Sequence, residues 1–151
     1  MMMYQRVLCA IDLDDLKSSR LVLQRARELA RLGQLTMMLL NVLRPLPINY
    51  VEFLPADFDA SELRAAKERL VHLLKDTGDL PASYTCTVRR GTPYVEILNE
   101  AAAVEADLII IGSHQPTFAS KLLGSNAASI ARHARVDVLI ARDPGSNCSA
   151  K

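Results

Sequence analysis

Short runs of consecutive apolar residues recur along the chain, separated by longer segments in which apolar and polar residues are mixed. Such runs are typical of strands buried on both faces, as in a parallel sheet covered by helices. Segment 83–89 differs, because it alternates polar and apolar residues and therefore predicts a strand with one exposed face, at a sheet edge. The buried strands are predicted at 6–11, 35–42, 108–111 and 136–141.

The mixed segments have apolar residues every three or four positions, which predicts helices with one buried face. Asp14, Asp15 and Ser18 are candidate N-caps of the first helix, and Asp59 with Glu62 resembles a capping box for the second. The predicted helices end at about 32, 76, 106 and 134.

Segment 44–59 carries three prolines and three aromatic residues and is too long for a simple turn. We interpret it as a flap packed over the sheet edge, with a mobile cover over a ligand as the alternative.

Strand and helix alternate four times before a fifth strand, which predicts one doubly wound α/β domain with a parallel sheet. The common five-strand orders are 3-2-1-4-5 and 2-1-3-4-5, and the exposed third strand favours 3-2-1-4-5. Ligands of such sheets bind at the carboxyl ends of strands at the topological switch point, here between the first and fourth strands. Asp12 and Gly112 follow those two strands.

The chain has 151 residues, half of them apolar, and a net charge of +1. A chain of this length buries roughly 70% of its unfolded surface and needs no disulfide or structural metal. Without a basic block, nucleic-acid binding has little electrostatic support. No apolar run could span a bilayer, and Asp12 interrupts any signal-peptide core, so we expect a cytoplasmic protein. The expected domain spans 1–143, with a polar tail at 144–151.

The candidate binding site lies in segment 107–126, where a buried strand ends at Gly112 and Gly124 opens a helix. The free N–H groups and the dipole at a helix N-terminus favour a phosphate. The two glycines are equally consistent with a strand terminator and an ordinary helix start. No Lys follows the second glycine and no Gly-x-Gly-x-x-Gly is present, so neither a Walker-type loop nor a Rossmann fingerprint is present.

Phosphates at this loop would be held by backbone N–H groups and by the hydroxyls of Ser113 and Ser125, with His114 or Lys121 adding charge if either side chain is oriented inward. Asp12 has three open roles: it orients a ribose hydroxyl, it orients a metal-bound water, or it caps the next helix. No nucleophile elbow and no Cys/His ligand spacing is present, so we expect neither catalytic residues nor a protein-held metal.

The last predicted strand is apolar on both faces, because Val136, Val138 and Ile140 alternate with Leu139 and Ala141. In the order 3-2-1-4-5 it lies at the sheet edge, and an exposed apolar edge favours pairing with a second chain. The alternative is a monomer whose edge is blunted by Arg135, Asp137 and Arg142.

Six motifs are distributed over nearly the full length of the chain. They are Val-Leu-Cys-Ala-Ile-Asp (7–12), Leu-Leu-Asn-Val (39–42), Gly-Thr-Pro (91–93), Ala-Asp-Leu-Ile-Ile-Ile-Gly-Ser-His (106–114), Gly-Ser-Asn-Ala (124–127) and Val-Leu-Ile (138–140). Together they resemble the universal stress protein family. Its nucleotide-binding branch has three spaced glycines, the last followed by Ser or Thr. Gly112 and Gly124-Ser125 match this pattern, whereas Gln115 replaces the middle glycine.

The resemblance implies the three-layer sandwich of the adenine nucleotide alpha hydrolase-like type and bound ATP with Mg²⁺. It implies Asp12 near the adenosine, the Val42 backbone against adenine, and a homodimer joined through the last strand, 136–142. The further residues implied around the ligand are Ala10, Ile11, Gly112, Ser113, His114, Gln115, Gly124, Ser125, Asn126 and Ala127.

Three functions remain open at this point. The first is an ATP-binding stress protein that acts as a regulatory switch through an ordered loop at 116–123. The second is an enzyme, a slow ATPase or phosphotransferase that uses bound Mg²⁺, and the third is a nucleotide-free dimeric interaction module.

Overall fold

The computed structural model of the chain describes residues 3–78, 80, 82–113 and 123–143. Five parallel strands form one sheet in the order β3-β2-β1-β4-β5, which confirms the predicted order 3-2-1-4-5 and the edge position of β3. The strands are β1 (Arg6–Ala10), β2 (Thr36–Leu43), β3 (Ser83–Arg90), β4 (Leu108–Gly112) and β5 (Asp137–Ala141). The helices are α1 (Leu16–Ala30), the short 3-10 helix η1 (Ile48–Phe53), α2 (Phe58–Thr77), α3 (Pro93–Ala103) and α4 (Ser125–His133).

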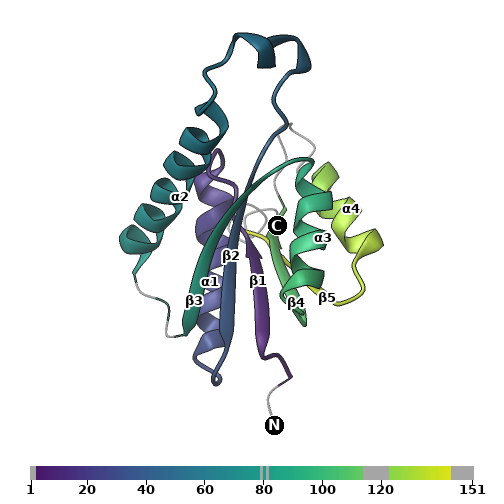
Figure 1. Cartoon of the computed structure of the whole chain (residues 1–151). Helices are drawn as coiled ribbons and strands as arrows, with labels where there is room; N and C mark the ends of the chain where they lie inside the picture. The colour runs from purple at the N-terminus through teal and green to yellow at the C-terminus, as the bar shows by residue number, and fades with distance from the viewer. Residues whose placement is uncertain (1–2, 79, 81, 114–122, 144–151) are drawn as a thin grey trace, which may run out of the picture.

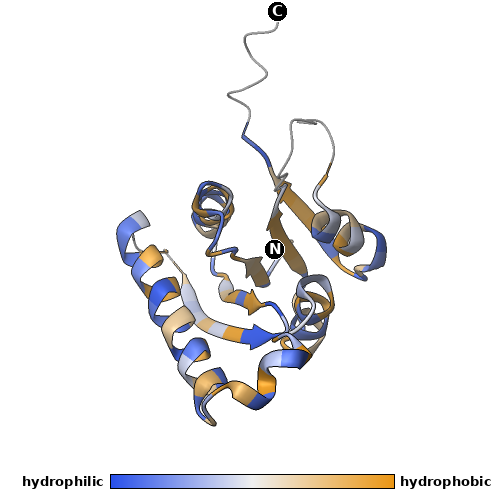
Figure 2. Ribbon diagram, turned by 90° about the horizontal axis from the view of Figure 1, so that it is seen from above, coloured by the Kyte–Doolittle hydropathy of each residue, from blue (hydrophilic) through white to orange (hydrophobic). Residues whose placement is uncertain are grey.

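Helices cover both faces of the sheet, α1 and α2 on one side and α3 and α4 on the other (Figures 1 and 2). Successive residues of a central strand therefore enter opposite cores: Val7 and Cys9 pack towards α1 and α2, and Leu8 packs towards α3 and α4. This alternation explains why the central strands are apolar at every position. In Figure 2 the edge strand β3 carries fewer strongly apolar residues than the centre of the sheet.

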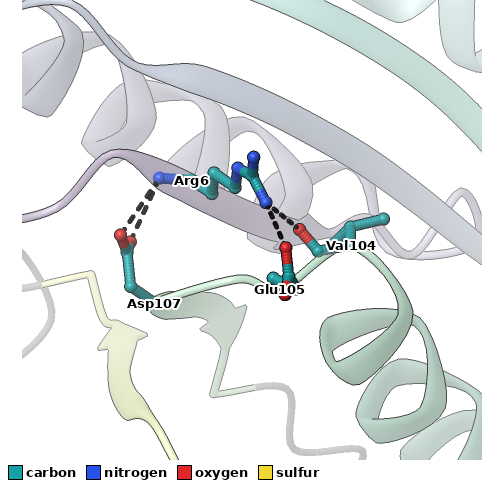
Figure 3. Close-up of polar contacts among 4 residues, drawn as sticks. All are labelled: Arg6, Val104, Glu105 and Asp107. Atoms are coloured by element: carbon teal, nitrogen blue, oxygen red, sulfur yellow. Dashed lines mark hydrogen bonds and ion pairs between the residues drawn. The ribbon is translucent and has the colours of Figure 1, made fainter.

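At their amino ends, β1 and β4 are joined by side chains (Figure 3). The Asp107 carboxylate accepts hydrogen bonds from the backbone N–H groups of Gln5, at 2.8 Å, and Arg6, at 3.2 Å. The Arg6 guanidinium in turn donates to Glu105 Oε2 at 2.8 Å. Glu105 has a φ of 54°, a left-handed turn that redirects the chain from α3 into β4. These bonds set the register of β1 and β4, so that their carboxyl ends lie beside each other.

Of the N-cap predictions, the one for α1 is confirmed and the one for α2 is wrong. Asp15 is the N-cap of α1, and its Oδ1 accepts from the N–H of Ser18 at 3.2 Å. The capping box predicted for α2 is wrong, because the N-cap is Asp57 and no side chain caps this helix. Asp59 and Glu62 instead bind Arg90 of β3.

The segment between β2 and α2 extends beyond the carboxyl ends of the strands (Figure 1). Its apolar side chains are not packed over the sheet edge, because Ile48 is 88% exposed and Phe53 is 80% exposed, with Tyr50 and Val51 also exposed. The interpretation as a packed flap is therefore wrong.

Candidate functional site

A cleft of about 580 Å³ opens at the carboxyl end of the sheet. Its floor is formed where β1, β2 and β4 end, and its walls include the first turns of α1 and α4. This is the topological switch point, where α/β sheets bind ligands, and the volume is in the range of about 300–1,000 Å³ that small-molecule sites occupy.

Most of the site residues predicted from sequence lie around this cleft. Those lining it are Ala10, Ile11, Asp12, Val42, Gly112, Gly124, Ser125, Asn126 and Ala127. Ser113 is described but does not line the cleft. His114 and Gln115 lie outside the described residues, as does most of the loop that follows them. The structure thus brings the two ends of the predicted phosphate-binding segment, Gly112 and Gly124, to one cleft. Their contacts with a ligand stay predictions.

Asp12 lies just after the end of β1 and is exposed. It accepts two hydrogen bonds from residues that follow it in the chain. Its Oδ1 accepts from the N–H of Asp14 at 2.9 Å, and its carbonyl accepts from the Ser19 hydroxyl at 2.6 Å. Because Asp15 caps α1, the capping role considered for Asp12 is filled by another residue. The carboxylate of Asp12 lines the cleft, and its role towards a ligand stays a prediction.

Gly112 ends β4 against the first turn of α1. A Cβ built on Gly112 would overlap the hydroxyl oxygen of Ser18 and would lie 3.2 Å from its Cβ. Glycine lets the start of α1 approach the end of β4, and a larger residue at this position would force the Ser18 side chain to move.

The N-terminus of α4 faces the same cleft. Gly124 is its N-cap, with no side-chain cap, and its carbonyl accepts the first intrahelical bond, from Ala128 at 2.9 Å. The N–H groups of Ser125, Asn126 and Ala127 precede that bond, so the helix itself offers them no acceptor. Three donors and the positive end of the helix dipole thus suit an anion such as a phosphate.

Several polar residues of the cleft were missed from sequence. Asn41 lies at the end of β2, is 4% exposed and donates from Nδ2 to the Ile11 carbonyl at 2.8 Å. A single amide inside an apolar strand is the signal that could have identified it, because buried polar groups need a specific partner.

Two arginines of the α1 and α2 side also line the cleft. Arg69 donates from Nη2 to the Leu13 carbonyl at 3.0 Å. Arg90 donates to Asp59 and Glu62 and, at 2.7 Å, to the Arg44 carbonyl. Burial alone would lower the pKa of Arg90, but its hydrogen bonds to the two carboxylates prevail and raise this pKa. Arg90 is thus a fixed cation that ties β3 to α2 and to Arg44, the residue that directly follows β2.

In the part of the chain that the structure describes, no helix is both long and apolar enough to cross a membrane. Nor do three or more His, Cys, Asp or Glu side chains gather in these ranges as a metal site would require.

The sequence model of the universal stress protein family matches residues 3–142. Universal stress protein G of Shigella flexneri is 30% identical over 143 residues, which cover 93% of this chain and 100% of the relative. A universal stress protein solved in complex with cAMP is 28% identical, with a TM-score of 0.59, and the match covers 91% of this chain and 95% of that one. The fold is also that of hypothetical protein MJ0577, with a TM-score of 0.78 at 23% identity, covering 93% of this chain and 97% of the other.

Proposed function

The chain belongs to the universal stress protein family, and on that premise we propose that its cleft binds an adenine nucleotide, in the first place ATP, as the signal of a stress-response regulator. One observation carries the proposal: Asp12, Gly112 and the uncapped N-terminus of α4 surround a single cleft at the switch point of the sheet. The family member solved with cAMP supports an adenine nucleotide as the ligand class.

Each part of the cleft suits one part of a nucleotide. The first N–H groups of α4 would receive phosphate oxygens. The Asp12 carboxylate would accept hydrogen bonds from ribose hydroxyls. Apolar side chains of α3 and α4, including Ile97 and Ile130, would cover the base. Mg²⁺ usually keeps several waters and phosphate oxygens as ligands, so one of the other carboxylates that line the cleft, Asp14, Asp15 or Glu62, would suffice to hold it through a water.

Calorimetric titration of the purified protein with ATP, ADP, AMP and cAMP tests the proposal. We expect binding of at least one of them, and a Gly124→Val variant should bind at least tenfold more weakly, or about 1.4 kcal/mol. The branched side chain would stand where a phosphate approaches the backbone. Ser61→Val places the same side chain in the first turn of α2, outside the cleft, and should leave the affinity unchanged. Wild-type protein that binds none of the four nucleotides would refute the proposal.

The regulatory role and the enzymatic alternative differ in turnover. The sequence shows no activated nucleophile or general base with the predicted phosphate-binding segment, so hydrolysis should be far slower than an ordinary enzyme's roughly 10 per second. A rate in that range, measured with Mg²⁺ present, would make the protein an ATPase. If no nucleotide binds or is released on denaturing the purified protein, the nucleotide-free interaction module becomes the better description.

A further inference from the structure

The segment that carries η1 stands free of the rest of the molecule. We call residues 45–54 the strap, and it rises from the end of the sheet at which the cleft opens (Figure 1). The backbone N–H groups of Tyr50 and Leu54 donate within the strap, to the carbonyls of Pro47 and Val51. In the described part of the chain, no hydrogen bond or ion pair joins the strap to residues outside it.

The strap presents large apolar side chains to solvent. More than half of the surface is exposed at each of Ile48, Tyr50, Val51 and Phe53. A 3-10 helix has three residues per turn, so two of the three edges of η1 are apolar, and only the edge of Asn49 and Glu52 is polar. Contiguous exposed apolar surface usually marks a place that something covers.

Arg90 anchors both ends of the strap at the rim of the cleft. Its guanidinium donates at 2.7 Å to the carbonyl of Arg44, the residue before the strap. It also donates to Asp59 and Glu62 in the first turns of α2, shortly after the strap. Arg44, Glu62 and Arg90 all line the cleft. The two points about which the strap can turn therefore lie beside the mouth of the cleft.

The backbone on either side of η1 is extended and stiff. Pro47 before η1 has a ψ of 125° and Leu54 after it has a ψ of 146°. Pro45 and Pro55 fix φ further along the two connections, so η1 would move as one unit. The four residues from Arg44 to η1 reach roughly 13 Å when extended. Because β2 and β4 lie only two strand spacings apart, roughly 10 Å, this reach carries η1 across the cleft mouth.

Resting on the proposed function, we propose that the strap is a lid: it closes over the cleft when a nucleotide fills it, and η1 is then buried at the cleft mouth. An empty cleft offers η1 mainly water. A bound nucleotide completes a surface on which the apolar side chains can pack, so it binds the closed form better and shifts the population towards it. Closure hides apolar surface that the open form exposes. A partner protein would therefore meet a different surface in the free and in the nucleotide-bound state, as a regulator requires.

The chain contains no tryptophan, so Phe53→Trp gives the strap a fluorescence signal of its own. Phe53 is exposed and stays aromatic, so this variant should fold as the wild type does. When ATP, or whichever of the four nucleotides titrates most tightly, saturates the protein, the emission should shift to shorter wavelengths and acrylamide should quench it less. Leu32→Trp is the matched control, because Leu32 is 75% exposed and follows α1 at the amino end of the sheet, opposite the cleft. Its emission should not change.

A lid also slows the release of what it covers. Phe53→Ser should release the nucleotide roughly tenfold faster, because one aromatic side chain no longer packs in the closed form, while the association rate changes little. Leu32→Ser removes an equally exposed apolar side chain far from the cleft and should leave both rates unchanged. Stopped-flow displacement of a fluorescent ATP analogue by unlabelled ATP measures the rates.

The outcomes separate closure of the strap from nucleotide binding. If calorimetry shows a bound nucleotide while the tryptophan of Phe53→Trp stays exposed, the lid is refuted and the proposed function stands. A tryptophan that is already buried without nucleotide, or an unchanged release rate in Phe53→Ser, refutes the lid in the same way. If none of the four nucleotides binds, the proposed function fails and this inference fails with it.

Discussion

Gly112 and Ser18 occupy one small space where β4 ends beneath the first turn of α1. Gly112→Ala should lower the free energy of unfolding by about 1–3 kcal/mol, because the new methyl group overlaps the Ser18 hydroxyl. Ser18→Ala in the same chain should restore part of this loss, and only part, since its Cβ remains 3.2 Å from the added one.

Urea unfolding of the two single variants and the double variant measures this coupling, provided the slope with urea is unchanged. Losses that simply add would show that the two residues do not compete for the same space.

At the same scale, the sequence predicted those site residues that belong to a contiguous motif, such as Gly124 and Ser125. It did not predict Asn41 or Arg90. Their importance depends on partners that the fold brings from other elements: the Ile11 carbonyl for Asn41, and two carboxylates of α2 for Arg90. No spacing along the chain encodes such pairs.

At the scale of elements, a hydrogen bond ties the segment before β1 to β5, which forms one edge of the sheet. The Tyr4 hydroxyl donates to Asp137 Oδ2 of β5 at 2.8 Å. This hydrogen bond is the main cause that raises the pKa of Tyr4 above its ordinary value of 10.0. A pKa raised on folding stabilises the folded state below the unfolded value, and this stabilisation is lost as pH rises through the folded value.

The stability difference between wild type and Tyr4→Phe should therefore be constant up to about pH 9 and should shrink above about pH 10. Chemical unfolding of both proteins at about pH 8 and about pH 11 measures it. Tyr84→Phe, on the exposed edge strand β3, serves as the matched control. A difference that grows with pH would contradict the role given to the Tyr4 bond.

Element order was predictable because each strand carries its own pattern, and the polar alternation of β3 alone distinguished the two common strand orders. The capping box of α2 was not predictable in the same way. Asp59 and Glu62 have the right spacing, but Arg90 lies within reach and competes for both carboxylates. A charged partner distant in sequence outweighs a neutral backbone N–H, since hydrogen bonds between ionised groups are the stronger ones.

At the scale of the whole molecule, β5 forms the second edge of the sheet and pairs only with β4 in the described part of the chain. Its apolar side chains enter both cores, Leu139 on one face and Val138 with Ile140 on the other, yet all three remain partly exposed. We propose that two copies of this strand meet across a two-fold axis, which would bury both edges.

Sedimentation tests this dimer. Wild-type protein should sediment as a dimer at roughly tens of micromolar, and Val138→Lys should shift it to monomer while nucleotide binding largely persists. Thr85→Lys places the same charge on the opposite edge, at β3, and should leave the dimer intact. Thermal unfolding checks that both variants fold. Monomeric wild-type protein would rule the dimer out.

The burial of Cys9 makes the opening of the sheet measurable. This thiol is fully buried on β1, between β2 and β4, and burial raises its pKa to about 12. Only the thiolate reacts with alkylating reagents, so Cys9 reacts when β1 leaves the sheet and not before. The rate at which Cys9 is alkylated in the native protein therefore reports how often β1 leaves the sheet. A ligand that binds only the closed sheet divides the labelling rate of Cys9 by a factor of one plus the ratio of the ligand concentration to its Kd. The affinity of the ligand can therefore be obtained from the reactivity of a residue that does not line the cleft.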